Sequence, residues 1–145
     1  MMFAVSELKA GLDLPRLTKP VSQENITRYA EVSRDFNPIH IDADYASKTP
    51  LGGTIAHGML VLAYVSQMMT DAFGRHWVTG GELTVRFKAP ARPGDTLTVG
   101  GQICQVHRSD DRQQVTCKVF CKNQNGETIL TGDTSVRFSK NENSR

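Results

Sequence analysis

An apolar segment in the middle of the chain restricts the possible folds more than any other feature. From Ile55 to Met69 the sequence is apolar on almost every side of a helix, and Gly58 lies near its start. A helix that is apolar all round belongs inside a hydrophobic core. Its longest unbroken apolar run, Met59 to Val65, is far too short to span a membrane. The rest of the chain is therefore expected to wrap around this helix.

The residues that follow this segment predict a sheet. From Glu82 onward every second residue is apolar: Leu83, Val85 and Phe87 alternate with polar residues. This alternation is typical of a strand. Turns rich in Pro, Gly, Asp and Asn separate the later segments. Strands are expected over residues 82–88, 96–108, 115–121 and 128–138, with a candidate edge strand over 16–19.

Helices are expected in the first half of the chain. Ser22 is suited to cap a helix over about residues 22–34, and Asp42 a short helix over 43–47. Pro38 is expected to close the first of these helices, because the residue before a proline is forced into an extended conformation. Helices followed by long antiparallel strands indicate an α+β fold, in which a sheet carries helices on one face.

Composition and charge narrow the class of protein. A chain of 145 residues is expected to form a single domain, 1–145, with a frayed polar tail over about 140–145. The net charge of +2 comes without a Lys/Arg cluster, which argues against a nucleic-acid partner. The N-terminus has no basic head followed by a long apolar run, so a cytoplasmic protein without a membrane association is expected.

The chain has three cysteines, Cys104, Cys117 and Cys121, and this odd number argues against a disulfide framework. Cys117 and Cys121 share a predicted strand, where four residues span about 13 Å. That distance is too long for a shared metal ion or a disulfide. All three are expected to be buried thiols, and no metal site is expected.

Polar residues around Pro38 are the first candidates for chemistry. Asp35, Asn37 and His40 lie where a helix is expected to end, and a carboxylate with an imidazole is the common pair for proton transfer near neutral pH. Asn37 could orient either partner through a hydrogen bond. A structural alternative stays open at this point, because loop Asp and Asn side chains routinely cap backbone amides.

The start of the apolar helix is the second candidate. His57 and Gly58 stand where free amides and the helix dipole can hold an oxygen that gains negative charge. Gly58 would let a ligand approach the backbone, or would only relieve crowding against the sheet. Ser66 falls roughly 80° further round the helix and could line a pocket.

These residues carry a resemblance to a known family. The strings SRDFNPIH and AHGML, with a seventeen-residue step from His40 to His57, resemble the hydratase motif of MaoC-like (R)-specific enoyl-CoA hydratases. The segment LTVRFKAPARPGDTLTV is similar to the central strand of that family and its Pro–Gly turn, so the resemblance covers about residues 20–138. It implies a hot-dog fold, an antiparallel sheet wrapped around a central helix, and a homodimer or dimer-based oligomer joined edge to edge.

The resemblance also implies an activity and roles for these residues. The substrate would be a trans-2-enoyl thioester, and the product an (R)-3-hydroxyacyl thioester. Asp35 and His40 would activate one water, and the Gly58 amide would bind the thioester oxygen. Asn37 and Ser66 would support the dyad or line the substrate pocket, and His57 would bind the substrate. No cofactor or metal is implied.

Other functions remain open from the sequence. A hot-dog acyl-CoA thioesterase would use a lone carboxylate or a Glu/Asn pair, which the Asp-x-Asn-Pro-x-His string does not match. A binding module for acyl thioesters would not need Asp35, His40 and Gly58 together. The acyl group of the substrate could be carried by coenzyme A or by acyl carrier protein. With acyl carrier protein as the carrier, the enzyme would be a 3-hydroxyacyl-ACP dehydratase. For a hydratase, the resemblance implies that residues 41–55 and 66–80 set the preferred acyl chain length.

Overall fold

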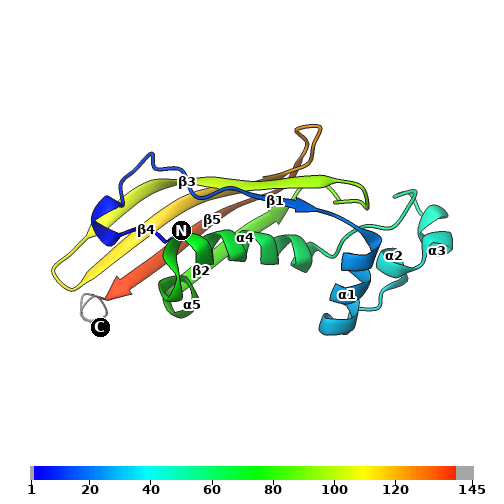
Figure 1. The fold of residues 1–145 in the computed structure, drawn as a ribbon, viewed down its shortest axis with the longest axis horizontal. Coiled ribbons are helices and arrows are strands. Elements are labelled where there is room, and N and C mark those ends of the chain that lie inside the picture. Colours follow the sequence, from blue (N-terminus) through cyan, green and yellow to red (C-terminus); the bar gives the residue numbers. More distant parts are fainter. Residues whose placement is uncertain (1, 140–145) are drawn as a thin grey trace.

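A central helix lying against an antiparallel sheet dominates the computed structural model, which describes residues 2–139 (Figure 1). The helix is α4, Gly58–Phe73. The sheet has five strands in the order β1-β3-β4-β5-β2, and every neighbouring pair is antiparallel. The strands are β1 (Leu17–Pro20), β2 (Gly81–Phe87), β3 (Thr96–Arg108), β4 (Arg112–Lys122) and β5 (Thr128–Ser139). The α+β architecture predicted from the sequence is confirmed, including the edge strand.

The remaining helices are short and collect at two places. A 3₁₀ turn, η1 (Val5–Glu7), precedes the sheet, and α5 (Arg75–Gly80) follows α4 directly. The other three are α1 (Gln23–Ser33), α2 (Pro38–Ile41) and α3 (Ala43–Ser47). Figure 1 shows α1, α2 and α3 grouped beyond the N-terminal end of α4. The two predicted candidate regions, around Pro38 and at the start of the apolar helix, are thereby brought together.

The core forms between α4 and the inner face of the sheet. α4 packs across β1, β3 and β4, and its buried residues are Val61, Val65, Met68, Met69, Ala72 and Phe73. The strands contribute alternate residues, as the period-two pattern predicts. The expectation that α4 is buried on all sides is only partly right, because Met59 is 57% exposed and Ala63 and Gln67 are also exposed.

An irregularity in β3 changes the position of one cysteine. The register between β3 and β4 shifts between Ile103 and Gln105, and such a bulge leaves the extra residue unpaired and re-aims its side chain. Cys104 is therefore exposed, whereas Cys117 and Cys121 are buried. The prediction of three buried thiols is wrong for Cys104. Burial raises the pKa of Cys117 to about 11 and that of Cys121 to about 12.

Two further predictions concern the ends of the chain and the membrane. The polar tail expected over about 140–145 lies outside the described residues. Within residues 2–139, no helix has both the length and the apolar character needed to cross a bilayer.

Candidate active site

The segment between α1 and α2 is shaped by its own polar side chains. Arg34 ends α1 in the left-handed conformation, with φ of 63°, which turns the chain back sharply. The Asp35 carboxylate then accepts a hydrogen bond from the Asn37 amide (3.2 Å). The Asn37 side chain accepts from the Ile39 amide (3.1 Å) and so caps α2. The capping role considered for these residues is thus real, and it places Asp35 and α2 in a defined geometry.

The helix α2 was not predicted. Pro38 is expected from the sequence only to close the preceding helix, but in the structure it is the first residue of α2. An Asn N-cap followed by Pro is also a helix-start signal, because the missing proline N–H has no acceptor in the first turn anyway. This short helix carries His40 in its last turn. Asn37 therefore fixes the start of the helix that holds His40, and its part in the site stays a prediction.

His40 presents one ring nitrogen for proton transfer. Its Nδ1 lies 2.8 Å from the carbonyl oxygen of Ile55. A carbonyl only accepts hydrogen bonds, so Nδ1 carries the proton and the neutral ring keeps a lone pair on Nε2. That is the form in which an imidazole acts as a general base. The half-buried ring is held by a residue fifteen positions away in the sequence.

Gln23 fixes the backbone of the same helix. Its amide nitrogen donates to the His40 carbonyl (2.8 Å), and its amide oxygen accepts from the Thr54 hydroxyl (2.7 Å). Gln23 thus joins the start of α1 to the end of α2 and to the segment leading into α4. The sequence carries no signal for this role, because Gln23 is an ordinary first-turn residue of a helix.

His57 lies between the two candidate regions. Its side chain is 2% exposed, and its Nε2 lies 3.0 Å from the backbone oxygen of Asp35. Its ring stacks on His40 with centroids 3.8 Å apart and planes 24° from parallel. Burial to this degree argues against the substrate contact expected for His57. The structure does bring Asp35, His40 and His57 together, with one ligand-type atom from each within 4.8 Å of the others.

This cluster does not have the geometry of a metal site. Imidazole nitrogens bind metals along lone pairs in the plane of the ring. The near-parallel, stacked rings of His40 and His57 direct their in-plane lone pairs side by side, so these do not meet at one point. Each ring also uses one nitrogen for a backbone carbonyl. The arrangement fits proton transfer by Asp35 and His40 better than coordination of an ion.

Gly58 offers a backbone donor beside the dyad. It is the first residue of α4, so its amide has no acceptor within the helix, and it donates to no other group among residues 2–139. A Cβ at this position would lie 3.0 Å from Cε1 of Phe87. Phe87, at the end of β2, is 52% exposed. An exposed aromatic ring, Phe87, therefore borders Gly58, and the sequence pattern alone does not single it out.

Ser66 lies about two turns further along α4. Its hydroxyl oxygen accepts a hydrogen bond from the indole nitrogen of Trp77 in α5 (2.9 Å), and the residue is half-buried. The hydroxyl proton remains available to another acceptor. The structure thus gives Ser66 a bond to α5 and leaves its predicted place in a substrate pocket as a hypothesis.

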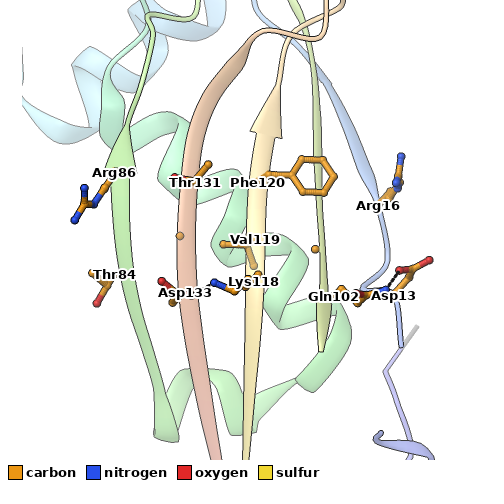
Figure 2. Close-up of a pocket in the computed structure, with 12 residues that line it drawn as sticks. Asp13, Arg16, Thr84, Arg86, Gln102, Lys118, Val119, Phe120, Thr131 and Asp133 are labelled. Atoms are coloured by element: carbon orange, nitrogen blue, oxygen red, sulfur yellow. Dashed lines mark hydrogen bonds and ion pairs between the residues drawn. The ribbon is translucent and has the colours of Figure 1, made fainter. Parts of the chain in front are cut away.

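A wide depression of about 610 Å³ lies away from the dyad, on the face of the sheet that is turned away from α4. Figure 2 shows its side chains projecting from the strands with α4 behind them. Neither Asp35 nor His40 lines it. Its Lys118 and Asp133 are paired with each other (3.5 Å), and both are exposed. No histidine among residues 2–139 lines this depression, so it holds no acid–imidazole pair, and we place the candidate active site at the dyad.

The sheet, the central helix and the acid–imidazole pair beside its N-terminus define a class of protein. The architecture is a hot-dog fold, as the resemblance implied. The chain belongs to the MaoC-like domain family, whose model matches residues 9–125.

Individual relatives agree with this assignment. The chain is 30% identical to a 3-hydroxybutyryl-CoA dehydratase of Methylorubrum extorquens over 94% of this chain and 84% of that protein. It is 30% identical to an (R)-specific enoyl-CoA hydratase of Rhodospirillum rubrum over 83% of this chain and 81% of that protein. The solved structure of the (R)-hydratase from A. caviae superposes with a TM-score of 0.77 at 26% identity, covering 91% of this chain and 98% of that one. The predicted family and fold are confirmed.

Proposed function

We propose that this protein catalyses the (R)-specific addition of water to trans-2-enoyl-CoA, giving (R)-3-hydroxyacyl-CoA, and the reverse dehydration. One observation carries the proposal. The Asp35 carboxylate and the His40 ring lie within 4.8 Å of each other, beside a Gly58 amide that has no acceptor in its own helix. This addition needs two things: an acid–base pair that activates water, and a fixed hydrogen-bond donor for the thioester oxygen.

The reaction follows from these positions. A water held between Asp35 and His40 gives a proton to the dyad as its oxygen bonds to C3 of the enoyl group. The electron pair of the C2–C3 double bond moves toward the thioester, whose carbonyl oxygen becomes enolate-like and accepts a hydrogen bond from the Gly58 amide. The proton then passes from the dyad to C2, so that one water has added across the double bond.

Two structural features favour this sequence. When His40 Nε2 takes the proton, the existing bond from Nδ1 to the Ile55 carbonyl (2.8 Å) becomes charge-assisted, and such bonds are roughly twice as strong as neutral ones. The donor at Gly58 is backbone at a helix start, so it is already oriented when charge develops. A single donor of this kind typically stabilises the transition state by about 3 kcal/mol.

The substrate site is open in a single chain, and we infer that a second copy completes it. Among residues 2–139, strand β2 is an edge of the sheet and pairs only with β5, which leaves a row of unpaired backbone groups. Phe87 at the end of β2 is 52% exposed, and Met59 beside Gly58 is 57% exposed. Pairing of β2 with β2 of another copy would cover both residues and enclose the space in front of the Gly58 amide.

The nature of the carrier is part of the proposal. Coenzyme A is favoured because two relatives with high coverage are named for CoA thioesters. A mitochondrial 3-hydroxyacyl-[acyl-carrier-protein] dehydratase of Arabidopsis thaliana is 31% identical over 89% of this chain, so acyl carrier protein is the alternative carrier. Thioester hydrolysis is the alternative chemistry, and it would release a free thiol that hydration does not.

The proposal is tested with crotonyl-CoA, followed as loss of the enoyl-thioester absorbance, with free thiol measured in parallel. Wild-type protein is expected to consume the substrate without thiol release and to give the (R)-product on chiral analysis. Asp35→Asn and His40→Ala are each expected to lower kcat by about 10²–10⁴-fold, the usual worth of general acid–base catalysis, while remaining folded.

Matched controls are available on exposed turns. His107 and Asp110 lie near the β3–β4 turn and are exposed, so His107→Ala and Asp110→Asn should hydrate at the wild-type rate. Wild-type rates in the Asp35 and His40 variants would contradict the mechanism. Thiol release without loss of the enoyl absorbance would contradict the activity. An enoyl-CoA series of increasing length would then define the acyl preference.

A further inference from the structure

His57 is the most deeply buried polar side chain at the candidate active site, and the mechanism above gives it no step. It precedes Gly58 directly and is the N-cap residue of α4, but its side chain makes no capping hydrogen bond. Its ring is 2% exposed. A buried imidazole that neither caps its helix nor reaches solvent needs another explanation. Burial of a polar group costs free energy unless the group makes a hydrogen bond.

The hydrogen bonding of His57 determines its tautomer. Nε2 lies 3.0 Å from the Asp35 carbonyl oxygen, which can only accept, so Nε2 carries the proton. Nδ1 is buried and has no hydrogen-bond partner within residues 2–139. A proton on Nδ1 would create a buried cation without an acceptor, face to face with His40. His57 is therefore a neutral ring that donates to the backbone of Asp35.

The faces of the ring are used as well. One face stacks on His40 at 3.8 Å, and the Tyr29 ring lies 4.8 Å away at 60°. Together with the in-plane bond from His40 to Ile55, the stack restricts rotation of the His40 ring and so the direction of its Nε2. A neutral π face also tolerates the positive charge that His40 acquires on taking a proton.

We propose that His57 is a positioning residue that holds Asp35, His40 and Gly58 in fixed positions relative to one another. Through Nε2–H it anchors the backbone of Asp35, through its ring it sets the plane of His40, and through the chain it is joined to Gly58. This inference rests on the proposed function, since it assigns His57 a role in that site. Displacement of a catalytic group by about 1 Å can cost about 10²-fold in rate, so a clamp on the dyad is expected to act on kcat.

Two substitutions of His57 test its hydrogen-bond donor and its aromatic ring separately. His57→Gln keeps an N–H donor close to the place of Nε2 but removes the aromatic face. His57→Phe keeps a ring against His40 but removes the donor. Because anchoring of Asp35 depends on the donor, His57→Phe is expected to lower kcat by about 10²-fold. His57→Gln should recover most of that loss, and KM should change little in either variant. His107→Gln, at an exposed histidine, is the matched control and should leave kcat unchanged.

A second readout does not need activity. Amide hydrogen exchange in a peptide covering residues 35–40 should be faster in His57→Phe than in wild type and near wild type in His57→Gln. Imidazole ¹⁵N NMR of the wild-type protein should show His57 protonated on Nε2 only. Should wild type fail to hydrate crotonyl-CoA, the proposed function falls, and exchange and NMR still decide the role of His57.

Three results would overturn the positioning role. Wild-type kcat and exchange in His57→Phe would show that the donor anchors nothing. Equal losses in both variants, in proportion to a lowered Tm, would show that the ring only fills space. An Nδ1-protonated His57 in the wild-type spectrum would remove the bond to Asp35 on which the proposal stands.

Discussion

Substitution of Gly58 by alanine tests the oxyanion role with little disturbance of the fold. The new Cβ would lie 3.0 Å from Cε1, 3.1 Å from Cζ and 3.4 Å from Cδ1 of Phe87. Phe87 is 52% exposed, so its ring can move outward by the few tenths of an ångström required. Gly58 does not have a positive φ, and alanine is a better helix former than glycine by up to about 1 kcal/mol. We therefore expect a change in the free energy of unfolding of no more than about 1 kcal/mol.

The catalytic effect should be much larger than the effect on stability. In the proposed mechanism the thioester oxygen approaches this amide, and we expect the added methyl group to crowd that approach. Loss of the full contribution of one such donor, about 3 kcal/mol, corresponds to about 160-fold in rate at 1.36 kcal/mol per tenfold. Because the amide itself remains, we expect kcat/KM for crotonyl-CoA to fall by about 10- to 100-fold.

A double variant distinguishes two causes of the lost activity: the new methyl group blocks the substrate, or it displaces the Phe87 ring. If the loss arose only because the Phe87 ring moves, adding Gly58→Ala to Phe87→Ala would cause no further loss. We expect it to lower kcat/KM by the same factor as in the wild-type background. Gly53→Ala is the control, since a Cβ there meets nothing within 4 Å. A Gly58→Ala enzyme with wild-type kcat/KM and an unchanged Tm would refute the oxyanion assignment.

Three further predictions concern the cysteines and the assembly. In the native protein a thiol reagent should modify the exposed Cys104 and spare Cys117 and Cys121; modification of all three at one rate would contradict their burial. Burial raises the pKa of Cys117 from 9.0 to about 11, so the neutral thiol favours the folded state, and the free energy of unfolding measured by urea titration should fall as pH rises above about 9. Light scattering should give twice the chain mass of 16.0 kDa, and a monomer at assay concentration would contradict completion of the site by a second copy through β2.

The sequence singled out candidate site residues, but it did not predict the contacts around them. Asp35, His40 and Gly58 were singled out from residue type and spacing, and the structure places all three at the N-terminal end of α4. The two readings of Asp35 were posed as alternatives, yet its carboxylate caps the Asn37 amide and also stands beside His40. A carboxylate has about four lone-pair sites and can do both, which spacing alone does not reveal.

The strands and the central helix were predictable because their signals are local. Alternation of apolar residues sets which side of β4 faces α4, and an apolar stripe sets which side of α4 faces the sheet. The exceptions are also informative. The bulge that exposes Cys104 depends on how β3 pairs with β4, and the open face at Met59 depends on which strands α4 crosses. Neither property belongs to a single segment.

By itself, the sequence determined the family, the α+β architecture and the acid–imidazole–glycine set, because periodicity and a motif of fixed spacing are written in neighbouring residues. Only the tertiary structure decided which nitrogen of His40 is free, that His57 clamps Asp35, and that Gln23 holds the backbone of His40. These contacts join residues 15, 22 and 17 positions apart. A hydrogen bond depends on the direction of a ring or an amide, and that direction is set by packing between segments distant in the chain.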